Sequence, residues 1–94
     1  MSNNFEEDLS DVRAFIALGG GASGWFARAY ASWYWCSDFW KVNLNGYQSL
    51  DGTNKKLFEK MLNLRTHADW NDRALHEVAL FAVEKWGLLP PEKI

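Results

Sequence analysis

Apolar residues recur at helical spacing near the start of the chain and predict a helix over residues 5–18. The apolar positions follow one another at intervals of three and four residues: Phe5, Leu9, Val12 and Ile16. Asn3 is the expected N-cap, because its side chain can accept a hydrogen bond from an amide that the helix start leaves unpaired. Three glycines at positions 19–21 are expected to end the helix, since glycine readily adopts the left-handed conformation.

A tryptophan-rich segment predicts a second helix over residues 23–40, beginning at Ser23. With about 100° of rotation per residue, six side chains lie on one face of this helix, which is the expected core face: Trp25, Phe26, Ala29, Trp33, Ser37 and Trp40. Trp35 and Phe39 project almost oppositely, beside Arg28, and Tyr34 lies on a third side. A helix that is apolar nearly all round is usually central in its fold. Trp35 and Phe39 therefore belong either to the core or to an exposed aromatic patch that meets a partner.

Residues 41–52 allow two interpretations. Asn45 followed by Gly46 is a strong hairpin signal between two short strands. Alternatively, Asn43 caps a short helical turn that buries three apolar side chains: Leu44, Tyr47 and Leu50. We favour the turn, because an isolated two-stranded hairpin is only marginally stable in water.

Two further amphipathic segments predict helices over residues 53–65 and 72–86. Asp51 or Thr53 is the expected cap of the first, and Asn71 or Asp69 that of the second, which ends at Gly87. Their inward faces are Leu57, Phe58, Met61, Leu62 and Leu64 in the first, and Leu75, Val78, Ala79, Ala82, Val83 and Trp86 in the second. The chain is thus predicted to be one all-α domain over residues 1–94 with four helices, of which the tryptophan-rich one is central.

Composition and charge narrow the class of protein. Hydrophobic residues make up 48% and charged residues 23% of the 94 residues, which is ordinary for a folded protein. The net charge of −2 has the wrong sign for non-specific nucleic-acid binding. The single cysteine, Cys36, suggests a reducing compartment. We find no secretory signal and no run of about 18 apolar residues, so we expect a cytoplasmic protein with no membrane contact.

No motif indicates catalysis. The glycine-rich stretch at 19–24 follows a predicted helix rather than a strand, which argues against a dinucleotide or phosphate loop. Residues of metal-ligand type cluster near the last helix, but their spacing matches no known metal site: His67, Asp69, Asp72 and His76. Cys36 is expected to be a buried, inert thiol. We therefore expect no enzyme activity, no cofactor and no metal.

Several segments resemble a family of small uncharacterised helical proteins encoded on bacterial plasmids and other mobile elements. They are FARAYASWYW at 26–35, LD at 50–51 and EKWG at 84–87 before a proline. The likeness spans about residues 22–90 and implies no activity, so no functional residue is transferred. Small proteins of such elements often inhibit host machinery by binding, as anti-CRISPR proteins do. By analogy, the resemblance implies a mobile-element or phage accessory protein that inhibits a host complex.

The expected function is that of a protein-binding module that acts without turnover. The candidate contact residues are Trp35, Phe39, Tyr34 and Arg28, with Trp70 from the loop before the last helix. Tryptophan and arginine are enriched at binding hot spots. Two alternatives remain open. One is a homo-oligomer that uses the same aromatic face, and the other is a nucleic-acid accessory protein that uses the basic ridge of Lys55, Lys56, Lys60 and Arg65.

Overall fold

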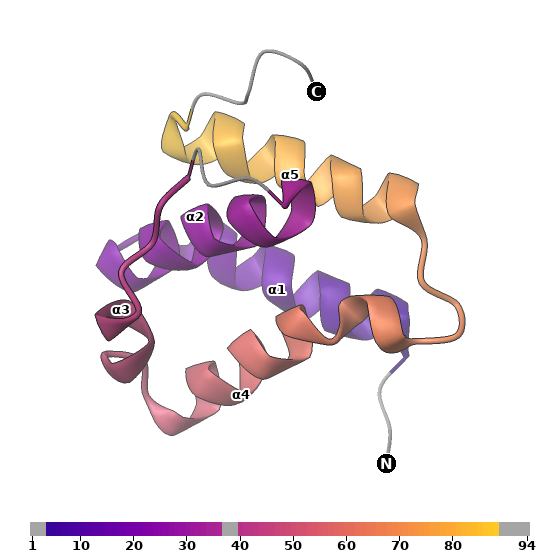
Figure 1. Cartoon of the computed structure of the whole chain (residues 1–94), viewed down its shortest axis with the longest axis horizontal. Helices are drawn as coiled ribbons and strands as arrows, with labels where there is room; N and C mark the ends of the chain where they lie inside the picture. Colours follow the sequence, from indigo (N-terminus) through magenta and orange to yellow (C-terminus); the bar gives the residue numbers. More distant parts are fainter. Residues whose placement is uncertain (1–3, 37–39, 89–94) are drawn as a thin grey trace.

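Helices make up the regular secondary structure of residues 4–36 and 40–88, which the computed structural model describes (Figure 1). The elements are α1 (Phe5–Leu18), α2 (Gly21–Trp35), α3 (Asn45–Gln48), α4 (Gly52–Leu62), the short 3₁₀ helix η1 (Leu64–Thr66) and α5 (Asp72–Trp86). The predicted all-α class is confirmed. This part of the chain contains no strand, so the hairpin interpretation of residues 41–52 is wrong.

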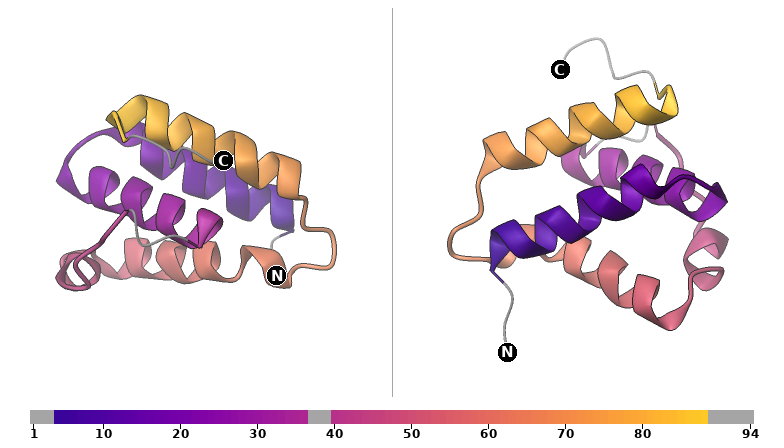
Figure 2. Two further views of the ribbon diagram at one scale, coloured as in Figure 1. Left: turned by 45° about the horizontal axis from the view of Figure 1, so that its top comes forward. Right: turned by 180° about the vertical axis from the view of Figure 1, so that it is seen from behind.

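The tryptophan-rich helix α2 shares the centre of the fold with α1. Figures 1 and 2 show these two helices between α5 on one side and α4 on the other. α1 packs against α2, α4 and α5, whereas α2 packs chiefly against α5. The largest fully buried side chains come from several segments: Trp40, Tyr30, Phe5, Phe26 and Ile16. The core is therefore built from both central helices and from the segment that follows α2.

Helix α1 has the predicted bounds, and all four residues of its predicted apolar stripe are buried. Its N-cap is Asn4 rather than Asn3, which lies outside the described residues. The Asn4 side chain accepts a hydrogen bond from the Glu7 amide at 2.8 Å, and the Glu7 side chain accepts one from the Asn4 amide at 3.4 Å. This reciprocal capping box leaves two fewer amides unpaired at the helix start.

Both predicted ends of the second helix are corrected. The helix begins at Gly21, and Ser23 is a buried residue of its first turn rather than its cap. It ends at Trp35, because Cys36 adopts a left-handed conformation with φ of 52°. Trp40 is consequently buried from outside the helix.

The segment before α4 forms the predicted helical turn. The Asn43 side chain accepts a hydrogen bond from the Asn45 amide at 2.9 Å. Leu50 is buried and Tyr47 is half-buried, as the turn predicts. Leu44 is instead 75% exposed, so its predicted burial is wrong.

Helix α3 is held against α2 by one tryptophan. The Trp25 indole nitrogen donates a hydrogen bond to the Asn43 carbonyl oxygen at 2.8 Å. The indole ring also lies so close to Gly46 that a β-carbon there would overlap it. Glycine at this position is therefore required by a close approach of α3 to Trp25.

The last two helices begin where side-chain caps were predicted. Asp51 caps α4 by accepting from the Asn54 amide at 2.8 Å, and Asn71 caps α5 by accepting from the Ala74 amide at 3.1 Å. Gly87 ends α5 in the left-handed conformation, as predicted. Helix α4 stops at Leu62, short of the predicted 65, because the chain tightens there into η1. This early stop sets the position of Arg65.

Candidate protein-binding surface

Aromatic side chains from three segments meet at the C-terminal end of α2. Tyr34 contacts Trp35 edge to face, with ring centroids 5.3 Å apart. Trp35 stacks on Trp40, with centroids 4.9 Å apart and an angle of 23° between the rings. His76 of α5 lies edge-on to Trp35 at 6.1 Å. Offset and edge-to-face contacts of this kind fix the rings relative to one another.

Arg65 of η1 adds a cation to this end of α2. Its guanidinium carbon lies 4.6 Å from the Trp33 ring centroid, 5.3 Å from that of Tyr34 and 5.9 Å from that of Trp70. These distances are within the range of cation–π attraction. Trp33 and Arg65 are half-buried, whereas Trp70 is 42% exposed. We call Trp33, Arg65 and Trp70 the arginine–tryptophan surface.

Arg65 also completes the end of α2. Its Nη2 donates a hydrogen bond to the Tyr34 carbonyl oxygen at 3.1 Å. This carbonyl is one of the last four of the helix, which have no partner within the helix. The last turn of α2 has no basic residue of its own, so Arg65 supplies the positive charge that the helix dipole favours there. The guanidinium is thereby held at the end of α2.

Two buried tyrosines support the surface from below. The Tyr34 hydroxyl donates to the Asp72 carboxylate at 3.1 Å, and the Tyr30 hydroxyl donates to the Leu75 carbonyl at 2.7 Å. Burial and the hydrogen bond to Asp72 raise the pKa of Tyr34 to about 12. Burial also raises the pKa of Tyr30 well above its ordinary value. Both hydroxyls therefore stay protonated at neutral pH and act as hydrogen-bond donors.

The predicted contact residues divide into several groups. The expectation that Tyr34 lies at the surface is corrected, because its side chain is only 8% exposed and lies in the core. Trp35 is half-buried, which lies between the two alternatives left open for it, and Arg28 is half-buried nearer the middle of α2. Trp70 is exposed. Phe39 lies outside the described residues.

Two residues of this surface were not among the predicted contacts. The sequence places Arg65 in a basic ridge with three lysines, yet its guanidinium lies over the rings of Tyr34 and Trp70. Trp33 had been placed on the core face, yet it is half-buried and packs against Arg65. A helical wheel of one segment shows neither contact, because both depend on where η1 lies against α2. The only signal in the sequence was the nearness of Arg65 to Trp70.

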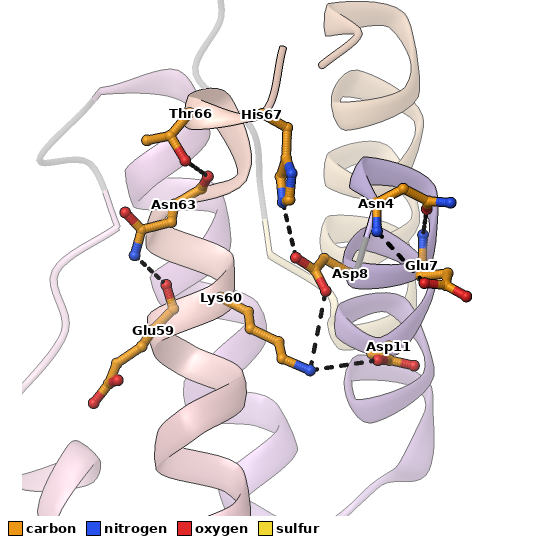
Figure 3. A network of polar contacts seen from close by, with 9 residues as sticks. All are labelled: Asn4, Glu7, Asp8, Asp11, Glu59, Lys60, Asn63, Thr66 and His67. Carbon is orange, nitrogen blue, oxygen red and sulfur yellow. Dashed lines mark hydrogen bonds and ion pairs between the residues drawn. The ribbon is translucent and has the colours of Figure 1, made fainter. Parts of the chain in front are cut away.

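A polar cluster joins α1 to the segment around η1 (Figure 3). The buried Asp8 carboxylate lies 2.8 Å from the His67 Nε2 atom. The Lys60 ammonium lies 4.0 Å from both Asp8 and Asp11. The Thr66 hydroxyl donates to the Asn63 carbonyl at 2.6 Å, within its own segment, as Figure 3 shows. These contacts tie α1 to residues on both sides of η1, and they therefore help to fix the position of Arg65.

The candidate metal ligands separate in space. His67 pairs with Asp8, Asp72 accepts from Tyr34, and His76 lies against aromatic rings. Within residues 4–36 and 40–88, no group of three or more histidine, cysteine, aspartate or glutamate side chains is arranged to hold a metal. Cys36 is exposed, so its predicted burial is wrong. The left-handed turn that ends α2 places it at the surface.

Among the described residues, the helices lack the combination of length and apolar character that crossing a bilayer requires. Comparison with protein-family models, curated proteins and solved structures finds no match to this chain.

Proposed function

We propose that this protein is a non-enzymatic protein-binding module that acts by occupying its partner through the arginine–tryptophan surface. The observation that carries this proposal is the position of Arg65, held between Trp33 and the exposed Trp70. Tryptophan, tyrosine and arginine are the residue types most enriched at binding hot spots. Here all three types meet at the end of one helix.

Preorganisation supports the same proposal. Immobilising a flexible side chain on binding costs about 0.5–1.5 kcal/mol. Arg65 is already held by its hydrogen bond to Tyr34, and Trp33 already packs against the Tyr30 ring at 5.5 Å. A partner therefore meets side chains that have lost much of their freedom on folding. The remaining guanidinium N–H groups suit a carboxylate or carbonyl group on the partner.

The test is an affinity pull-down from a lysate of the native host, followed by mass spectrometry. Trp70→Ala removes the exposed ring, and Leu80→Ala is the matched control, because these two side chains are 42% and 45% exposed. We expect a partner that binds the wild type and Leu80→Ala with equal affinity. The same partner should bind Trp70→Ala at least about thirtyfold more weakly. The identity of that partner then decides whether the module inhibits a host complex.

Equal retention by all three proteins would contradict the proposal. Circular dichroism of each variant is the control for folding. Arg65→Lys provides a second test, because a lysine keeps the charge but loses the planar fork that stacks on the rings. We expect this variant to weaken binding while the helical content stays unchanged.

A further inference from the structure

Helices α3 and α4 lie on the side of the molecule opposite α5 (Figure 1). An apolar groove lies between their side chains. The groove has a volume of about 380 Å³ and is lined by Leu44, Tyr47, Gln48, Phe58, Glu59 and Leu62. Leu44 is 75% exposed and Leu62 is 45% exposed. We call these six residues the α3–α4 groove. A highly exposed leucine thus forms part of the wall of a hollow that two aromatic rings also line.

One tyrosine places two opposite charges at this groove. The Lys55 ammonium lies 5.6 Å from the Tyr47 ring centroid. The Tyr47 hydroxyl donates to the Glu59 carboxylate at 3.3 Å. Lys55 and Glu59 lie four residues apart on α4, so they occupy one side of that helix. The groove therefore presents a cation and an anion one helical turn apart.

This pattern fits a second copy of the same surface. In a two-fold interface each patch meets itself, so an exposed leucine, a hollow and two opposite charges on one face are all satisfied at once. With the two α4 helices antiparallel, Lys55 of each copy faces Glu59 of the other. A partner surface of one charge sign would leave either Lys55 or Glu59 opposed by a like charge.

We propose that the α3–α4 groove is the interface of a two-fold homodimer. Leu44 of each copy enters the groove of the other, and the two lysine–glutamate pairs fix the antiparallel register. An interface of usual size buries about 800 Å² of each partner, about one seventh of the 5921 Å² that this chain exposes. A contact centred on six residues is small, so we expect a weak dimer that forms only at high protein concentration.

The first test is sedimentation of the pure full-length protein from about 1 μM to about 1 mM. The mass rises from 10.8 kDa toward twice that value. Leu44→Asp, which carries the charge in both copies, raises the dimer dissociation constant about thirtyfold or more. Leu80→Asp on α5 is the control and leaves it unchanged. A wild-type mass that stays at 10.8 kDa throughout overturns the proposal.

The second test uses charge reversal. Lys55→Glu and Glu59→Lys each place like charges across the two-fold axis and weaken self-association about fivefold. An equimolar mixture of the two variants restores opposite pairs and forms a mixed dimer about as tight as the wild type. A mixture no tighter than either variant alone overturns the antiparallel pairing.

The dimer is independent of the arginine–tryptophan surface. Trp70→Ala therefore leaves the dissociation constant of the dimer unchanged, and Leu44→Asp leaves the folded monomer available to another partner. If Trp70→Ala weakens self-association as much as Leu44→Asp does, the second copy docks elsewhere and the proposal fails. The failure of either proposal is thus visible without the other.

Discussion

The arginine–tryptophan surface and the α3–α4 groove are held in place in different ways. The first is organised around a cation that caps a helix: Arg65 donates to the Tyr34 carbonyl and lies over aromatic rings. The second is organised around a close approach: Gly46 lies directly against Trp25, which positions α3. Both surfaces expose large apolar side chains, Trp70 in one and Leu44 in the other.

The two surfaces therefore differ in which contacts hold their side chains in place. At the arginine–tryptophan surface, the buried Tyr30 packs against Trp33 and the buried Tyr34 lies beneath the Arg65 guanidinium. At the groove, α3 is held by the close approach of Gly46 to Trp25, by the indole hydrogen bond and by the hydrogen bond from Tyr47 to Glu59. Substitutions in the first region should therefore act through the core, and those in the second through the position of α3.

The largest expected effect separates support from contact within the aromatic region. Trp40→Ala removes a buried ring that stacks on Trp35 and should lower the free energy of unfolding by about 3–5 kcal/mol. Trp70→Ala removes an exposed ring and should cost less than about 1 kcal/mol. Urea denaturation followed by fluorescence measures both. Equal costs would show that the Trp40 ring stabilises the fold no more than an exposed ring does.

A smaller effect is expected at the groove. Gly46→Ala introduces a methyl group that overlaps the Trp25 ring, and it should destabilise the fold by about 1–3 kcal/mol. Gly52→Ala is the control, because its β-carbon would meet open space, and it should be neutral or stabilising by up to about 1 kcal/mol. Alanine favours helices over glycine, so any loss at Gly46 is steric. Unchanged stability of Gly46→Ala would mean that α3 is free to shift.

The smallest effect at neutral pH comes from the tyrosines. Tyr34→Phe removes a single hydrogen bond to Asp72 and should cost about 1 kcal/mol. Above pH 10 the wild type should lose stability, because the pKa of Tyr34 rises from 10 in the unfolded chain to about 12 in the fold. The unfolded chain then releases its proton first, so this contribution, complete below pH 10, is lost as the pH rises through 12.

Denaturation at a series of alkaline pH values measures this window. Tyr34→Phe should show a flatter loss of stability between pH 10 and 12 than the wild type. Tyr47→Phe, in the groove, is the matched control; the pKa of Tyr47 is also raised, but its half-exposed ring is screened by water. If Tyr47→Phe reduces the alkaline loss of stability more than Tyr34→Phe does, the groove tyrosine rather than the buried one dominates this pH dependence.

Local patterns in the sequence predicted the helices well where each residue acts within its own segment. The apolar stripe of α1, the side-chain caps at Asp51 and Asn71, and the end of α5 at Gly87 are all confirmed. The caps succeed because a side chain bonds an amide only two or three residues away. The end of α2 failed because Cys36, a residue with no strong left-handed preference, adopts that conformation.

The candidate site was predictable only in its residue types. The sequence predicted contact residues at Trp70 and near the end of the tryptophan-rich helix, but it placed Arg65 in a basic ridge and His67 in a cluster with Asp72. Asp8 and His67 are 59 positions apart, and Arg65 and Tyr34 are 31 apart. No periodicity carries information over such separations, because both contacts depend on the packing of α1 and η1 around α2.

The sequence by itself determined that this chain is helical and where most of its helices begin, because spacing and capping are local properties of the backbone. Only the tertiary structure decided which rings are covered. Tyr34 is buried and Trp70 is exposed because α5 covers one side of α2 whereas the loop before α5 lies at the surface. Burial is a property of neighbours that come together in space, and it cannot be assigned one segment at a time.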